Sequence, residues 1–168
     1  MNTAMVMIEE AKREMLRHTI ATAAYRGSKA ILNAPEGFAE FCINNTTRTP
    51  GEILAHMSDV LEWALRAAKG ENVYDESAPL PWEEGAARFF RSLQEFDAYL
   101  ATNAPLLLGY TAEKMFQGPV ADILTHIGQI TMMRRMAGSP VRAEIYPMAE
   151  IVIGRVGREQ SAERVEFD

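Results

Sequence analysis

Cysteine is almost absent from this chain, since Cys42 is the single one among 168 residues. A lone cysteine excludes an internal disulfide framework and any site built on a C-x-x-C pair. The chain also lacks a long uncharged apolar run, because its most apolar stretch, about residues 115–133, is interrupted by Asp122 and His126. We therefore expect no membrane-spanning segment.

Positive charge is not in excess either. The formal net charge is -6 at pH 7, from 17 Lys and Arg against 23 Asp and Glu. Nucleic acid and anionic membrane surfaces are bound by clustered Lys and Arg, so we expect neither as a partner. The first three residues, Met-Asn-Thr, do not resemble the basic start and apolar run of a secretory signal, which favours a cytoplasmic protein.

The common catalytic motifs are missing as well. The sequence contains no G-x-S-x-G, no H-E-x-x-H, no glycine-rich phosphate loop and no G-x-G-x-x-G. These absences remove support for the commoner hydrolase, protease, nucleotide and dinucleotide classes. No E-x-x-H occurs, which disfavours a ferritin-like di-iron site.

What the chain does have is apolar residues at helical spacing along most of its length. Proline and glycine clusters divide this pattern and predict four long helices, over about residues 3–32, 50–69, 82–102 and 118–137. We therefore predict the all-α class, as a four-helix bundle of up-down topology. The length suits a single domain over residues 1–168, with a core of about 5–141 and a short C-terminal extension, 142–168.

Within the last predicted helix, residues 119–130 read PVADILTHIGQI and carry three polar side chains along one line. Asp122, His126, Gln129 and Met133 fall within a wedge of about 60° on a helix, so the stripe should face the interior or a cleft. A carboxylate there requires compensation by an ion pair, a hydrogen-bond network or a metal. The Asp-x-x-x-His spacing places both side chains one turn apart, as in helical metal sites.

A third ligand is offered by one of the three histidines of the chain. His18 lies among arginines and suits a surface position, whereas His56 lies at the margin of an apolar helical arc and can face the interior. Two histidines and one carboxylate suit a divalent transition metal with open positions. Spacing alone equally allows a hydrogen-bonded Asp122–His126 core pair, with Gln129 as a structural or second-shell amide.

The helix GEILAHMSDVLEW, with its single inward histidine, and the later helix DILTHIGQI after a Gly-Pro pair resemble the DinB-like family, also called DinB/YfiT-like. The resemblance spans about residues 5–141. It implies a four-helix bundle that forms a homodimer and holds a metal with three histidines. It also implies an enzyme acting on a small molecule, either a metal-dependent hydrolase or a transferase of low-molecular-weight thiols such as bacillithiol or mycothiol.

Carried over to this chain, the resemblance matches His56 and His126 to the first and last of the family's histidines, while Asp122 replaces the middle one. A carboxylate in this position favours Zn, Ni, Fe or Mn. Such a metal would lower the pKa of a water or a thiol, and Glu52 or Asp59, one turn from His56, would accept a proton or orient a ligand. The alternative is a non-catalytic dimeric bundle, a binding or structural module in which Asp122 and His126 form a polar core pair.

Overall fold

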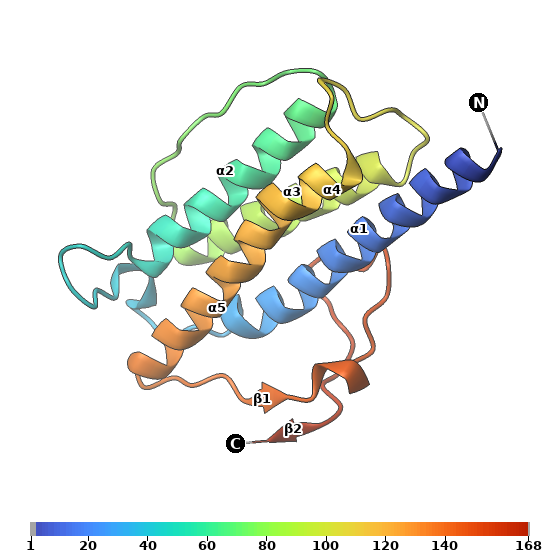
Figure 1. Cartoon of the computed structure of the whole chain (residues 1–168). Helices are drawn as coiled ribbons and strands as arrows, with labels where there is room; N and C mark the ends of the chain where they lie inside the picture. Colours follow the sequence, from blue (N-terminus) through green and yellow to red (C-terminus); the bar gives the residue numbers. More distant parts are fainter. Residues whose placement is uncertain (1–2, 168) are drawn as a thin grey trace.

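Residues 3–167 are described by a computed structural model. Four long helices dominate it: α1 (Thr3–Ile31), α2 (Pro50–Ala68), α3 (Trp82–Leu100) and α5 (Ala121–Met136). They lie side by side, with α1 and α2 each packed against both α3 and α5 (Figure 1). The predicted all-α class is confirmed. No helix within residues 3–167 combines the length and apolar character needed to cross a membrane.

The start of α2 follows the capping pattern present in the sequence. The Thr49 side chain accepts a hydrogen bond from the backbone N–H of Glu52, whose carboxylate accepts one from the backbone N–H of Thr49 at 2.7 Å. Pro50 occupies the first helical position, where no N–H is required. This capping box fixes the first turn of the helix that carries His56.

The final helical segment begins earlier than the sequence predicts. A short helix, α4 (Ala112–Met115), and a π-helical turn, η2 (Phe116–Val120), precede α5, so that Pro119 lies inside the segment. The side chain of Thr111 accepts a bond from the N–H of Lys114 and caps the new start. Pro119 cannot donate to the regular ladder, and the wider turn interrupts that ladder where the donor is missing.

One hydrophobic cluster connects all the helices. Its largest fully buried side chains come from α1, α2, α3, α4 and α5: Ile20, Ile31, Leu54, Met57, Leu61, Phe89, Leu93, Phe96, Leu100, Met115 and Ile123. Burying an apolar side chain of this size contributes roughly 1.5–3 kcal/mol. The helices are therefore held in fixed relation to one another, which fixes the side chains at the edge of the core.

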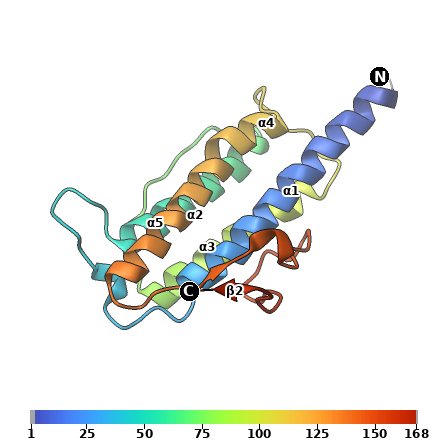
Figure 2. The ribbon, with the colours of Figure 1, turned by 60° about the horizontal axis from the view of Figure 1, so that its bottom comes forward.

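The C-terminal extension runs along α1 on the side away from α2 (Figure 2). It contains β1 (Ala143–Glu144), the 3-10 turn η3 (Tyr146–Met148) and β2 (Glu166–Phe167), with the two strands paired antiparallel. The fully buried carboxylate of Glu144 accepts bonds from Tyr25 Oη at 2.8 Å and Lys29 Nζ at 2.9 Å. Because a buried carboxylate needs such partners, this contact anchors the extension to α1.

The end of α1 is held by a buried arginine of α5. Arg134 donates to the carbonyl oxygens of Ala30, Leu32 and Asn33, each at 3.1 Å. The last carbonyl groups of a helix have no partner within the helix, and positive charge is favourable there. Arg134 therefore joins the carboxyl ends of α1 and α5.

The remaining short element of the fold, the 3-10 turn η1 (Phe38–Glu40), leads from α1 towards α2.

We predict that Thr111→Ala lowers the free energy of unfolding by about 1 kcal/mol, because α4 loses its side-chain cap. Thr111→Ser keeps a hydroxyl at the same position, so its free energy of unfolding should be close to that of the parent. Urea unfolding of the three proteins measures the difference. Equal stability of the alanine variant and the parent would show that the Thr111 hydroxyl does not cap this helix.

Candidate metal centre

Three predicted ligands from two helices meet at one point. Asp122 Oδ2 lies 3.3 Å from His56 Nε2 and 3.4 Å from His126 Nε2. The two imidazole rings are 5.0 Å apart between centroids, at an angle of 84°. One ligand atom from each residue lies within 4.8 Å of the others, so the group can hold a metal ion. We call these three residues the triad.

The triad follows from helical spacing on α5 and from the packing of α5 against α2. Asp122 and His126 are one turn apart on α5, which places both side chains on the same face. His56 lies on α2, which packs against that face. The third histidine, His18, is exposed on α1 and is not part of the group.

Gln129 determines which nitrogen of His126 carries a proton. Its Oε1 lies 2.8 Å from His126 Nδ1. An amide oxygen can only accept, so Nδ1 donates, and a neutral His126 then presents the lone pair of Nε2 to the carboxylate of Asp122. A lone pair and a carboxylate repel each other unless a cation lies between them. That cation is either a proton on Nε2 or a metal ion.

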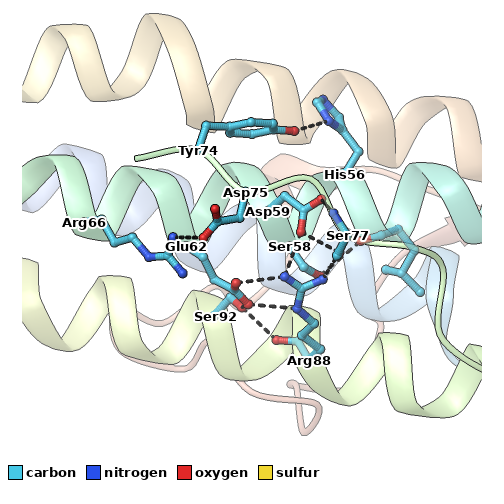
Figure 3. Close-up of polar contacts among 11 residues, drawn as sticks. His56, Ser58, Asp59, Glu62, Arg66, Tyr74, Asp75, Ser77, Arg88 and Ser92 are labelled. Carbon is cyan, nitrogen blue, oxygen red and sulfur yellow. Dashed lines mark hydrogen bonds and ion pairs between the residues drawn. The ribbon is translucent and has the colours of Figure 1, made fainter. Parts of the chain in front are cut away.

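His56 has a corresponding partner in Tyr74, whose hydroxyl lies 3.2 Å from His56 Nδ1 (Figure 3). A tyrosine hydroxyl accepts as well as donates, so Nδ1 can carry the proton and leave Nε2 for a metal. Burial lowers the pKa of His56, and the charges of Arg48 and His126 lower it further, against the opposing effect of Asp122. The neutral imidazole, the form that binds metals, is thus favoured.

The triad lies at the rim of the core and is open to small molecules. The side chain of His126 is 12% exposed, that of His56 23% and that of Asp122 42%. His56 lines a cavity of about 160 Å³, His126 a hollow of about 440 Å³, and Asp122 a hollow of about 480 Å³. A metal here would keep coordination positions accessible, as catalytic sites require.

The two carboxylates predicted to assist the chemistry line the cavity beside His56. Glu52 accepts the capping bond of α2. Asp59, whose side chain is 1% exposed, accepts bonds from the backbone N–H and the hydroxyl of Ser77 at 3.0 and 2.7 Å and from Arg88 Nη2 at 2.7 Å (Figure 3). Asp59 therefore has a structural role. Catalytic roles for Glu52 and Asp59 remain predictions.

The segment between α2 and α3, residues 71–81, is held along α2 by polar contacts. Trp63 Nε1 donates to Asn72 at 3.0 Å. Arg66 pairs with Asp75, and Ser77 binds Asp59 (Figure 3). These contacts place Tyr74 beside His56. Sequence reasoning missed Tyr74, and no local signal marks it, because the contact joins an irregular segment to a helix 18 residues away.

Comparison of the chain with protein-family models, with curated proteins and with solved structures found no match. The fold and the site by themselves define an all-α protein with a group of two histidines and one aspartate that can hold a metal. The chemistry of that group has to be argued from its own residues.

We predict that Tyr74→Phe weakens binding of Zn²⁺ by about tenfold, since partners of a ligand histidine typically change metal affinity by roughly 10–100-fold. Tyr110→Phe is the matched control, because it removes a hydroxyl from a tyrosine that does not contact the triad. Competition with a chromophoric chelator measures both affinities. An unchanged affinity in the Tyr74 variant would exclude the hydroxyl as a support of His56.

Proposed function

We propose that this chain is a metal-dependent enzyme in which His56, Asp122 and His126 hold a divalent ion. The observation that carries the proposal is the convergence of the triad's ligand atoms within 4.8 Å. Partners on both imidazole Nδ1 atoms support it, because they leave each Nε2 to face the carboxylate. Two imidazoles and one carboxylate suit Zn, Ni, Fe or Mn.

We further propose that the protein is a DinB-like enzyme. The packing of α1 and α2 against both α3 and α5 is compatible with an up-down four-helix bundle, and the extension from residue 142 onwards is an addition to it. The two helices that carry the resemblance are the two that supply the triad. Asp122 replaces a histidine of the family, and its carboxylate still offers one ligand atom.

The proposed activity is hydrolysis, or transfer of a low-molecular-weight thiol, on a small-molecule substrate. When bound, a divalent ion supplies a Lewis acid that lowers the pKa of a water or a thiol towards neutrality. Gln129 and Tyr74 fix the orientation of the two imidazoles, and Glu52 is a carboxylate of the adjoining cavity that can take a proton. The net charge of -6 disfavours nucleic acid as a partner.

The second candidate is a non-catalytic helical protein in which the triad is a polar cluster. The distances of 3.3 and 3.4 Å from Asp122 to the two histidines also suit an imidazolium paired with a carboxylate. In that state the cation between the groups is a proton and no metal is taken up. The metal content of the purified chain separates the two candidates.

The decisive substitution is at Asp122. We expect Asp122→Asn to weaken Zn²⁺ binding at least about tenfold, because a neutral amide oxygen is a poor ligand, and Asp122→His to retain or raise the affinity by providing a third imidazole. Calorimetric titration with Zn²⁺ and thermal unfolding are measured on both variants.

The polar-cluster candidate gives a different outcome for the same proteins. Asp122→Asn would then take up as much metal as the parent and would lose about 1–3 kcal/mol of stability from the broken contacts. Unchanged metal uptake in this variant removes Asp122 from the set of ligands and overturns the proposed function.

We also propose that the protein forms a homodimer through α1. Met5, Ile8 and Met15 are 60%, 54% and 65% exposed and lie along one side of this helix. Met15 and Phe116, which is 47% exposed, line a hollow of about 350 Å³ between α1 and the start of the final helical segment. Exposed apolar residues that gather on one face are typical of an interface.

Light scattering at tens of micromolar should therefore give the mass of a dimer. Ile8→Glu together with Met15→Glu should yield the monomer, because two carboxylates cannot be buried without partners. Met7→Glu is the matched control, since Met7 is 64% exposed but lies off this side of the helix. A parent protein that scatters as a monomer contradicts the dimer.

A further inference from the structure

Arg48 lies between the two cavities that adjoin the histidines of the triad. It lines both the cavity beside His56 and the hollow beside His126. Its charge acts on the His56 imidazole. Within residues 3–167 its guanidinium forms no hydrogen bond or ion pair, whereas Arg17, Arg66 and Arg88 are each paired with a carboxylate. Arg48 is thus a cation beside the triad that is available to an anion.

The hollow beside His126 is the larger of the two and is mainly apolar. Its walls include four hydrophobic side chains: Ile43, Ile53, Met132 and Met133. Its volume of about 440 Å³ lies within the range of roughly 300–1,000 Å³ that ligand sites occupy. Methionine side chains adapt to the shape of a bound apolar group. This hollow suits the hydrocarbon part of a small molecule.

The polar groups of the same hollow are Thr47, Arg48, His126 and Gln129, and no carboxylate from residues 3–167 lines it. Because Gln129 Oε1 is used by His126, the amide NH₂ of Gln129 remains as a donor. The wall is therefore rich in donors and carries positive charge at Arg48. An anionic group is the complement of such a wall.

A single guanidinium matches a planar, singly charged carboxylate by two parallel hydrogen bonds. A dianionic phosphate needs more positive charge than Arg48 alone supplies. Glu52 and Glu76 line the cavity on the other side of Arg48, and they repel a dianion about twice as strongly as a monoanion. The observations favour a carboxylate over a phosphate monoester.

We propose that the hollow beside His126 binds a small carboxylate with an apolar chain, the carboxylate on Arg48 and the chain against Ile43, Ile53, Met132 and Met133. The claim that this carboxylate is the substrate of the triad rests on the proposed function. The claim that it binds in the hollow depends only on side chains of the protein. Arg48 is then a specificity-determining residue of the enzyme.

The test is calorimetric binding of hexanoate to the full chain, both loaded with Zn²⁺ and after treatment with a chelator. Acetate lacks the chain, hexan-1-ol lacks the charge, and hexyl phosphate carries the second charge. We expect hexanoate to bind tightest of the four in both forms of the protein. Arg48→Gln should lower the affinity for hexanoate at least about tenfold, which corresponds to 1.4 kcal/mol. Arg48→Lys should lower it by a smaller factor, because lysine keeps the charge.

Two further variants make the result specific. Met132→Ser should weaken hexanoate and leave acetate unchanged, because Met132 is 59% exposed and contributes to the apolar wall without supporting the core. Arg91→Gln, which removes an exposed arginine that lines none of these cavities, should bind hexanoate like the parent. Retained Zn²⁺ uptake in Arg48→Gln shows that the triad is intact.

Four outcomes overturn the proposal: equal binding of hexanoate and hexan-1-ol, tighter binding of hexyl phosphate, unchanged binding in Arg48→Gln, and loss of hexanoate binding on removal of Zn²⁺. The last would assign the carboxylate to the metal and not to Arg48. The proposed function fails separately, when the parent takes up no metal. Arg48-dependent binding of hexanoate by such a metal-free protein would still support the site.

Discussion

The packing of α2 against α5 is the contact on which the site depends. Apolar side chains of both helices, among them Met57 and Ile123, are buried in the common cluster, and this burial fixes how the two helices face each other. His56 and His126 come to lie on either side of Asp122 only because of that packing. A shift of one helix by a single turn, about 5.4 Å, would move the two histidines too far apart to bind the same metal ion.

The π-helical turn η2 sets the rotation of α5 relative to α4. A π turn contains an additional residue compared with an α turn, so the side chains that follow it face a different direction from those of an uninterrupted helix. Met115 before the turn and Ile123 after it are both fully buried. Pro119 interrupts the ladder three residues before Asp122, and the position of the carboxylate on the rim therefore depends on this turn.

A charged network of Arg88, Asp59 and Glu62 lies near the triad without being part of it. Arg88 bridges Asp59 and Glu62, and the buried side chain of Asp59 holds Ser77. Removing one partner of such a buried pair typically costs about 3–5 kcal/mol, because the other charge remains without compensation. This network keeps the segment that bears Tyr74 in place, so that the support of His56 depends on charged side chains of α2 and α3 outside the triad (Figure 3).

The sequence alone determined the helices and the composition of the triad. Apolar periodicity, the Thr49 cap and the proline clusters are local, and local hydrogen bonds and side-chain spacing decide them, so the bounds of α1, α2 and α3 were predictable to within a few residues. Asp122 and His126 share a helix face for the same reason. The earlier start at Thr111 was missed because Gly118 and Pro119 carry the stronger breaker signal.

Only the tertiary structure decided what surrounds these residues. Tyr74 lies beside His56, and Arg48 lies between the two cavities. Both residues belong to irregular segments that pack beside helices, so no sequence periodicity predicts where they lie. The exposure of Asp122 likewise depends on how far α2 and α5 cover each other's rims. Periodicity specifies which face of a helix is apolar, whereas the burial of each polar group at its margin is a property of the packed chain.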